Sequence, residues 1–174
     1  DLDMHGAFLK KTLEKEGIST DAVIEDPDYF TTLAFVAIDE SGEREFSFAR
    51  KPGADTQLTK EELDQRLLSD CRIFHFGSLS LTDEPARGTT MEAAAIAKRA
   101  GAVISYDPNY RASLWKDEKT AVEGMQSAIP LADVMKVSDE ECLLMTGAAT
   151  YEEAADQLLA MGPKLVAVTL GRSE

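Results

Sequence analysis

The spacing of apolar residues changes along the chain near residue 59, and the part before this point predicts one helix and one β-hairpin. The helix is predicted over Met4–Glu16, because apolar residues recur there at the spacing of a single helical face. Those residues are Met4, Phe8, Leu9 and Leu13. Asp3 is a suitable N-cap for this helix, and Gly17 is a suitable residue to end it.

The β-hairpin is predicted from two strand-like segments, Thr31–Ile38 and Arg44–Arg50, with aromatic residues in both. The residues Asp39-Glu-Ser-Gly42 fit a four-residue hairpin loop. A hairpin that precedes an α/β region is a candidate lid over a binding site. The alternative is an edge extension of the main sheet, and we expect the lid.

From Thr59 onward, segments with helical spacing alternate with short apolar segments. Helices are predicted over Thr59–Leu68, Pro85–Ala100, Thr120–Ile129, Ser138–Met145 and Thr150–Met161. Strands are predicted over Arg72–Phe76, Val103–Tyr106, Asp133–Val137 and Leu165–Leu170. Strands separated by helices require crossover connections, which predict a parallel sheet with helices on both faces. The expected fold class is therefore α/β.

Composition narrows the classes of function. The 174 residues include 18 Lys and Arg against 32 Asp and Glu, which gives a formal net charge of −14. Without a basic stripe, neither nucleic acid nor an anionic membrane surface is expected as a partner. The chain shows no signal-peptide pattern and no apolar run of membrane-spanning length, and Cys71 and Cys142 lack metal-ligand spacing. We therefore expect a cytoplasmic protein with reduced thiols.

Small and polar residues follow each predicted parallel strand. They are Gly77-Ser78, Asp107-Pro-Asn-Tyr-Arg111, Ser138-Asp-Glu-Glu141 and Thr169-Leu-Gly171. Parallel strands place their C-terminal ends at one edge of the sheet, where open α/β folds bind ligands. Arg111 offers a planar fork for a phosphate or a carboxylate, and Glu141 is suited to hold a metal-bound water, because Mg²⁺ keeps several waters. This combination fits phosphoryl transfer.

Each of these features also has a purely structural explanation. Asp107-Pro-Asn109 is ordinary turn chemistry, and Ser138-x-x-Glu141 is also a capping box. Thr169 fits an ordinary strand end, and Gly171 an ordinary turn. No Gly-x-Gly-x-x-Gly follows a strand and no Walker A sequence occurs, which disfavours a classical dinucleotide or P-loop site.

Four single residues are expected to be structural. His75 lies in a predicted strand between two phenylalanines, which predicts a hydrogen-bonded core histidine, whereas His5 is expected at the surface. Trp115 is expected to pack the preceding loop against the sheet. Gly124 is expected to interrupt the pattern of its helix.

Several motifs together resemble the ribokinase-like (PfkB) carbohydrate kinases, and among them the fructokinases. The segments that carry the resemblance are Asp3-Met-His-Gly6, the hairpin with Arg50-x-Pro-Gly-Ala-Asp55, His75-Phe-Gly-Ser78, Asp107-Pro-Asn-Tyr-Arg111-x-x-Leu-Trp115, Lys136-Val-Ser-Asp-Glu-Glu141 and Val168-Thr-Leu-Gly171. The fifth resembles the Asn-x-x-Glu motif of that family, with Ser138 in place of the asparagine. The most specific is Asp107–Trp115, which fructokinases share with 2-keto-3-deoxygluconate kinases.

The resemblance implies an ATP-dependent phosphorylation of a sugar, most simply fructose, with ATP and Mg²⁺ as cofactors. It also implies a three-layer α/β/α fold with a mostly parallel sheet and a β-hairpin lid over residues 31–50. A 2-keto-3-deoxygluconate kinase or another PfkB sugar kinase is the alternative within the family. A non-catalytic sugar- or nucleotide-binding module is the alternative of another class.

Residue roles carried over from the family place Arg111 on the transferred phosphate. Sugar binding is implied for Arg50, Asp107 and Asn109, and nucleotide binding for Lys136, Ser138, Thr169 and Gly171. Glu141 is implied to hold the metal through water. Lids of this family often pair across subunits, so the hairpin implies a homodimer.

Two segments of the family pattern have no counterpart in residues 1–174. These are an N-terminal Gly-Gly sugar-binding segment and a Gly-Ala-Gly-Asp motif whose aspartate is the catalytic base. The chain also begins without Met and ends soon after a strand. We therefore expect residues 1–174 to be the central part of one α/β kinase domain, which is inactive on its own.

Overall fold

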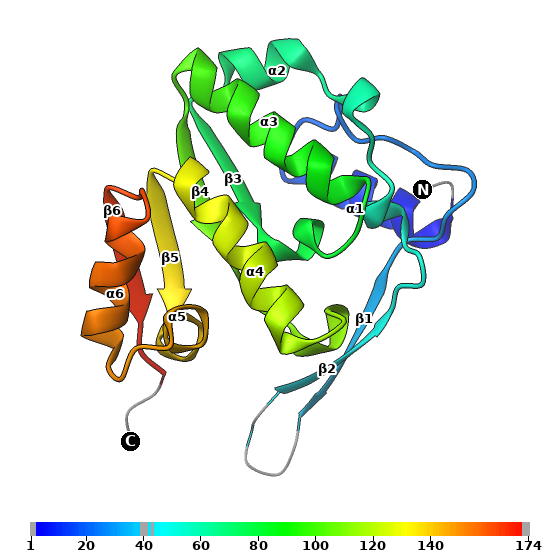
Figure 1. The fold of residues 1–174 in the computed structure, drawn as a ribbon. Coiled ribbons are helices and arrows are strands. Elements are labelled where there is room, and N and C mark those ends of the chain that lie inside the picture. The colour runs from blue at the N-terminus through cyan, green and yellow to red at the C-terminus, as the bar shows by residue number, and fades with distance from the viewer. Residues whose placement is uncertain (1–2, 39–41, 43, 172–174) are drawn as a thin grey trace.

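The computed structural model describes residues 3–38, 42 and 44–171 (Figure 1). In this part of the chain the helices are α1 Met4–Lys15, α2 Gln65–Asp70, α3 Ala86–Ala100, α4 Glu118–Ala128, α5 Asp139–Thr146 and α6 Tyr151–Ala160. The strands are β1 Leu33–Ile38, β2 Arg44–Ala49, β3 Ile73–Gly77, β4 Val103–Asp107, β5 Val134–Ser138 and β6 Leu165–Thr169. Short 3-10 turns lie at Ala54–Thr56, Lys60–Glu62, Ser78–Leu81, Ala112–Leu114 and Ile129–Leu131.

The strands form two separate sheets. The larger sheet has the order β3-β4-β5-β6 and is parallel throughout, as the alternation of helices and strands predicts. β1 and β2 form an antiparallel hairpin that is not hydrogen-bonded to this sheet, so an edge extension is wrong for the described residues. Figure 1 shows the hairpin projecting away from the larger sheet. Residues 39–41 of the predicted hairpin loop lie outside the described residues.

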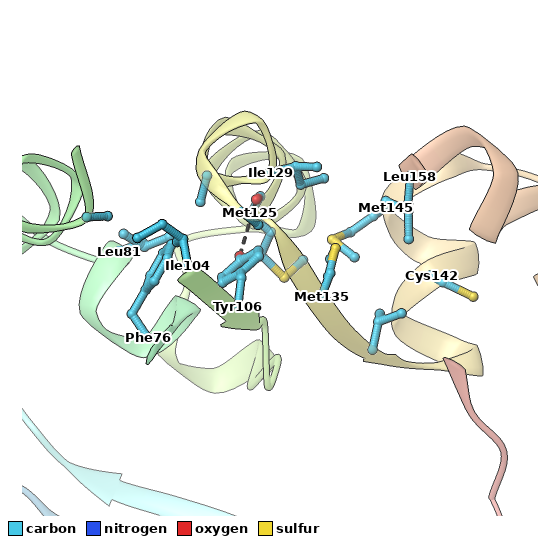
Figure 2. Close-up of a cluster of buried hydrophobic side chains, with 14 of the residues drawn as sticks. Phe76, Leu81, Ile104, Tyr106, Met125, Ile129, Met135, Cys142, Met145 and Leu158 are labelled. Atoms are coloured by element: carbon cyan, nitrogen blue, oxygen red, sulfur yellow. Dashed lines mark hydrogen bonds between the residues drawn. The ribbon is translucent and has the colours of Figure 1, made fainter. Parts of the chain in front are cut away.

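One face of the parallel sheet forms the core. Alternate residues of the strands point to this face, and α3, α4, α5 and α6 cover it (Figure 1). The fully buried members from the two central strands are Ile104, Tyr106, Met135 and Val137. Burial of each large apolar side chain stabilises the fold by about 1.5–3 kcal/mol. The Tyr106 hydroxyl, the one polar group of this set, donates to the Met125 carbonyl at 3.2 Å (Figure 2), and burial raises its pKa.

The opposite face of the sheet is exposed within the described chain. Ile73, Val103 and Leu165 are 64%, 43% and 52% exposed, and each comes from a position that alternates with a core residue. The predicted α/β class with a parallel sheet and a separate hairpin is confirmed. The helices α3–α6 supply one of the two helical layers expected of an α/β/α arrangement.

The start of α1 confirms the predicted cap. The Asp3 carboxylate accepts hydrogen bonds from the backbone N–H groups of His5 and Gly6, both at 2.9 Å, and of Thr31 at 2.8 Å. Hydrogen bonds from Gly6 and Thr31 stabilise the charged form and lower the pKa of Asp3 to about 2. Asp3 therefore also fixes the start of the hairpin segment to α1. His5 is exposed, as expected.

The helix predicted over Thr59–Leu68 is wrong as one element. The Glu62 carboxylate does accept from the Thr59 backbone N–H and hydroxyl, at 2.8 and 2.9 Å, as in the predicted capping box. The chain then becomes extended at Leu63, and the Asp64 carboxylate caps a new helix, α2. A second N-cap residue within the segment thus divides it.

The ring of Trp115 packs against α4 at the position of Gly124. A Cβ atom at Gly124 would lie 2.6 Å from two ring carbons of Trp115, so the glycine makes room for the indole on α4. Trp115 is also a member of the buried core cluster that contains the strand residues Phe76 and Tyr106, which is consistent with the expected packing of its loop against the sheet. α4 is continuous through Gly124, as the predicted helix over this segment requires.

Replacement of Gly124 by alanine is expected to lower the free energy of unfolding by about 1–3 kcal/mol, because the added methyl group overpacks the Trp115 contact. Helix propensity alone would give the opposite sign, a stabilisation of about 1 kcal/mol. Urea unfolding of the variant measures the sign. The matched control is Gly88→Ala in α3, where the nearest atoms are flexible ends of Glu84 and Lys60. If Gly124→Ala stabilises as Gly88→Ala does, the packing explanation is wrong.

Two further expectations from the sequence concern the state of the cysteines and membrane-spanning helices. Cys71 and Cys142 are free thiols, and burial raises the pKa of Cys142. In residues 3–38, 42 and 44–171, none of the helices is both long enough and apolar enough to span a membrane.

Candidate functional site

The loop after β4 is held tightly against the end of β3. Pro108 is fully buried, and its carbonyl accepts the Ser78 backbone N–H at 2.9 Å. A Cβ atom at Gly77 would lie 3.0 Å from the Asp107 carbonyl oxygen, so the predicted small residue does permit a close approach of the two strand ends. Asn109 has φ 48°, a left-handed conformation that asparagine tolerates better than most residues. The loop thus has a fixed shape.

Asp107 lies at the centre of the polar groups from this loop. Its carboxylate lies 3.3 Å from the Lys136 ammonium, which comes from the neighbouring strand β5, and it accepts the Asn109 backbone N–H at 3.2 Å. Both partners of the ion pair are partly exposed, with side chains 25% exposed for Asp107 and 47% for Lys136. The structure therefore brings together Asp107, Asn109 and Lys136, and the pair stays accessible to a ligand.

A cleft of about 320 Å³ opens beside this loop, lined by His75, Gly77, Leu79, Ser80, Asp107 and Asn109. The expectation that His75 is a core histidine is wrong. His75 pairs in register with Ser105 on the exposed face of the sheet, and its Nδ1 lies 3.0 Å from the Ser105 hydroxyl. The two flanking phenylalanines favoured a buried position for His75. The period-2 alternation of a strand, however, places Phe74 and Phe76 on one face and His75 on the other. This alternation is the sequence signal that could have identified His75 as a cleft residue.

Glu141 is both a capping residue and a link between two strand ends. One carboxylate oxygen accepts the Ser138 backbone N–H at 2.9 Å, and the Ser138 hydroxyl accepts the Glu141 N–H at 3.1 Å, so the capping box is confirmed. The other oxygen accepts the backbone N–H of Tyr110 at 2.6 Å. The cap of α5 is thereby joined directly to the loop after β4. Sequence spacing alone does not reveal this long-range bond.

The metal site fits the residues present only in the water-mediated form. No group of three or more His, Cys, Asp or Glu side chains suited to hold a metal ion occurs among the described residues. Mg²⁺ does not require such a cage, because it keeps several waters and uses one or two carboxylates. Each Glu141 oxygen accepts one backbone hydrogen bond and retains a second lone pair for a metal-bound water.

The side chain of Arg111 extends from the loop after β4 toward the hairpin. Its guanidinium donates to the Tyr110 carbonyl at 2.7 Å and lies over the Phe46 ring of β2, 4.7 Å from the ring centroid. Among the described residues it forms no ion pair. A guanidinium stacked in this way keeps most of its N–H edges available for an anion.

Arg50 has a different environment from Arg111. Its side chain is 4% exposed, and its guanidinium pairs with Asp55 and donates to the Thr82 hydroxyl at 2.9 Å and the Leu79 carbonyl at 2.8 Å. These bonds fix the base of the hairpin to the turn after β3. Leu79 also lines the cleft, so one Arg50 hydrogen bond ends on a residue that borders it.

The predicted nucleotide-side residues lie one and two strands further along the sheet. Thr169 pairs in register with Ser138, and its hydroxyl donates to the Val137 carbonyl at 3.4 Å. Gly171 follows β6, and a Cβ atom added to it would contact no described residue other than its chain neighbours within 4 Å. The structure places Lys136 and Ser138 on β5 and Thr169 on the neighbouring strand β6.

Comparisons with known proteins identify relatives of this chain. A family model described as pfkB family carbohydrate kinase matches residues 2–174. Probable fructokinase-5 of Arabidopsis thaliana is 42% identical over 170 residues, which amount to 97% of this chain and 52% of that protein. The chain therefore spans about half the length of the relatives that it matches.

Two solved structures share the fold. Fructokinase with bound ATP from Xylella fastidiosa superposes with a TM-score of 0.86 at 35% identity, covering 99% of this chain and 55% of that one. Fructokinase from Vibrio cholerae O395, in a form with bound fructose, ADP and calcium ion, gives a TM-score of 0.87 at 33% identity, covering 98% of this chain and 55% of that one.

Proposed function

Because this chain belongs to the pfkB family of carbohydrate kinases, we propose that it forms the sugar-and-phosphate part of an ATP-dependent sugar kinase whose substrate is fructose. The observation that carries the proposal is the junction of two neighbouring strand ends. Asp107 ends β4, Arg111 lies in the loop that follows it, and Glu141 lies in α5, directly after β5. The backbone N–H of Tyr110 in that loop donates to Glu141 and joins the two strand ends. Relatives named fructokinase, one of them with fructose and ADP bound, support fructose as the substrate.

The proposed roles follow from the hydrogen-bonding groups that each side chain still has available for a ligand. Asp107 and Asn109 face the cleft and offer hydrogen-bonding groups to sugar hydroxyls. Arg111 has free guanidinium edges for the transferred phosphate. Arg50 has most of its donors occupied, so we place it as the clamp of the hairpin base, which supports the sugar site indirectly.

The nucleotide is proposed to lie over the ends of β5 and β6. Lys136, Ser138, Thr169 and Gly171 border this region, and the two strands are adjacent in the sheet. Glu141 is proposed to bind a metal-held water. Mg²⁺, when bound with ATP, supplies charge neutralisation at the phosphates. The relative with ATP bound supports ATP as the donor.

Assembly and location are separate proposals. We propose a homodimer through the hairpin, supported by the exposed side chains of Phe35, Val36 and Ile38 on β1, which are 59%, 51% and 71% exposed.

The proposal also includes a cytoplasmic location. It names a sugar and ATP as the small-molecule partners, and it includes no nucleic-acid partner. The net charge of −14 supports the last point.

A coupled assay of ADP release tests the proposed activity. The protein in its natural length is expected to release ADP with fructose, and less with ribose and 2-keto-3-deoxygluconate. A preference for 2-keto-3-deoxygluconate would identify the alternative kinase within the family. No ADP release with any sugar, together with retained sugar or nucleotide binding, would identify a non-catalytic binding module instead.

Residues 1–174 alone are expected to show no turnover in the same assay, because a Gly-Ala-Gly-Asp motif is absent from this sequence. The measurement compares ADP release by this chain and by the natural-length protein at equal concentration. Turnover by the 174 residues alone would show that a base within them starts the reaction.

A further inference from the structure

Arg111 and Phe46 join the hairpin to the loop after β4. The guanidinium carbon of Arg111 lies 4.7 Å from the Phe46 ring centroid, within the range of about 6 Å over which cation–π attraction acts. β2 also contacts the turn Ala112–Leu114, which directly follows Arg111. The contact thus connects a projecting hairpin to the loop that carries the predicted phosphate-side arginine.

The alternation of β2 directs the ring toward this loop. Phe46 and Phe48 are half-buried, whereas the intervening Ser47 and the preceding Glu45 are exposed. The two rings stack with centroids 6.2 Å apart and an interplanar angle of 12°. β2 therefore turns an aromatic face inward, and Phe46 is the member of this face that lies under a guanidinium in the described chain.

Arg50 and Arg111 both contact the hairpin region, but they differ in whether an acidic side chain neutralises their charge. Arg50 is neutralised by Asp55 and buried, so it is fixed. Arg111 forms no ion pair among the described residues, although the chain carries 32 acidic residues. Its neighbours there are a carbonyl and an aromatic ring. Both attract the cation without a full opposing charge, which leaves it able to bind an anion.

We infer that Phe46 is a positioning residue for Arg111: the hairpin, through this ring, holds the guanidinium in the direction from which it meets the transferred phosphate. The inference rests on the proposed function of Arg111. It gives the hairpin a role besides covering the sugar, because displacement of β2 removes one of the two contacts that orient Arg111. Lid position and phosphate binding are then coupled through one side-chain pair.

Kinetics of matched variants test the inference in the natural-length protein. Phe46→Leu removes the ring and keeps an apolar side chain, and it is expected to lower kcat about 5- to 30-fold with little change in the KM for ATP. Phe46→Tyr keeps the ring and is expected to restore most of this loss. The matched control Phe48→Leu, on the same face of β2, is expected to stay within about 2-fold of the unchanged protein. Equal losses for Phe46→Leu and Phe48→Leu would overturn the inference.

A double-variant cycle separates positioning from a general structural effect. In an Arg111→Met background, Phe46→Leu is expected to lower kcat by less than 2-fold further, because the group that it positions is absent. A full additional loss would overturn the inference. Urea unfolding of the same four proteins is expected to show non-additive changes in the free energy of unfolding, and additive changes would also overturn it. If the unchanged protein phosphorylates no sugar, the proposed function fails, and the unfolding cycle alone decides whether Phe46 and Arg111 are coupled.

Discussion

Replacement of Arg111 by glutamine is expected to lower the kcat for fructose phosphorylation about 100-fold. The guanidinium is the predicted cation nearest the transferred phosphate, and loss of one preorganised donor to developing charge costs about 10²–10³ in rate. A loss of 100-fold corresponds to about 2.7 kcal/mol of transition-state stabilisation. Arg111→Lys is expected to recover only part of it, because lysine neither stacks on Phe46 nor presents a planar fork. Steady-state kinetics with saturating ATP measure both effects.

Arg99→Gln is the matched control for the change in net charge. The Arg99 side chain is 66% exposed at the end of α3 and makes one ion pair, at 3.5 Å to Glu92. Its replacement is expected to change kcat by less than 2-fold, since such exposed pairs contribute little. If both glutamine variants have the same activity, Arg111 takes no part in phosphate binding.

Replacement of Glu141 by glutamine is expected to have the second large effect, a fall of about 100-fold in kcat together with a loss of about 1–3 kcal/mol in the free energy of unfolding. An amide NH₂ cannot accept a hydrogen bond, so one of the two backbone donors, Ser138 N–H or Tyr110 N–H, loses its partner. The uncharged side chain also binds a metal-held water less strongly. Kinetics and urea unfolding of the same preparation measure the two effects together.

The control for Glu141 is a capping residue of the neighbouring helix. Glu153 lies at the corresponding position of the α6 cap, where it accepts the Ala149 N–H at 3.3 Å and donates its own N–H to Thr150. Glu153→Gln is expected to cost stability without a comparable fall in kcat. If Glu141→Gln lowers stability alone and leaves kcat unchanged, Glu141 is only a cap, which is the structural explanation that its spacing also allows.

The fold was predictable because its determinants are local. The N-caps at Asp3, Ser138 and Thr150 and the alternation of helical and strand periods set most element boundaries, and the structure agrees with them. The exceptions arise where a second local signal competes. Asp64 starts a new helix inside a predicted one, and the start of α4 moves to Glu118, because the Asp117 carboxylate caps it through the Thr120 N–H.

The candidate site was predictable only as a set of strand ends. Parallel pairing explains why Asp107 and Lys136 meet, because their strands are neighbours. It does not reveal that Arg50 is already paired with Asp55, that Arg111 turns toward Phe46, or that Glu141 reaches Tyr110. Those contacts join segments far apart in sequence, so they depend on the tertiary arrangement and not on motif spacing.

Identification of the phosphorylated product tests the central claim most directly. Phosphorus NMR of the natural-length protein with ATP, Mg²⁺ and fructose is expected to show ADP and a new phosphomonoester resonance in equal amounts, which requires transfer of the phosphoryl group to a sugar hydroxyl. Unchanged ATP, or ADP accompanied only by inorganic phosphate, would contradict the account.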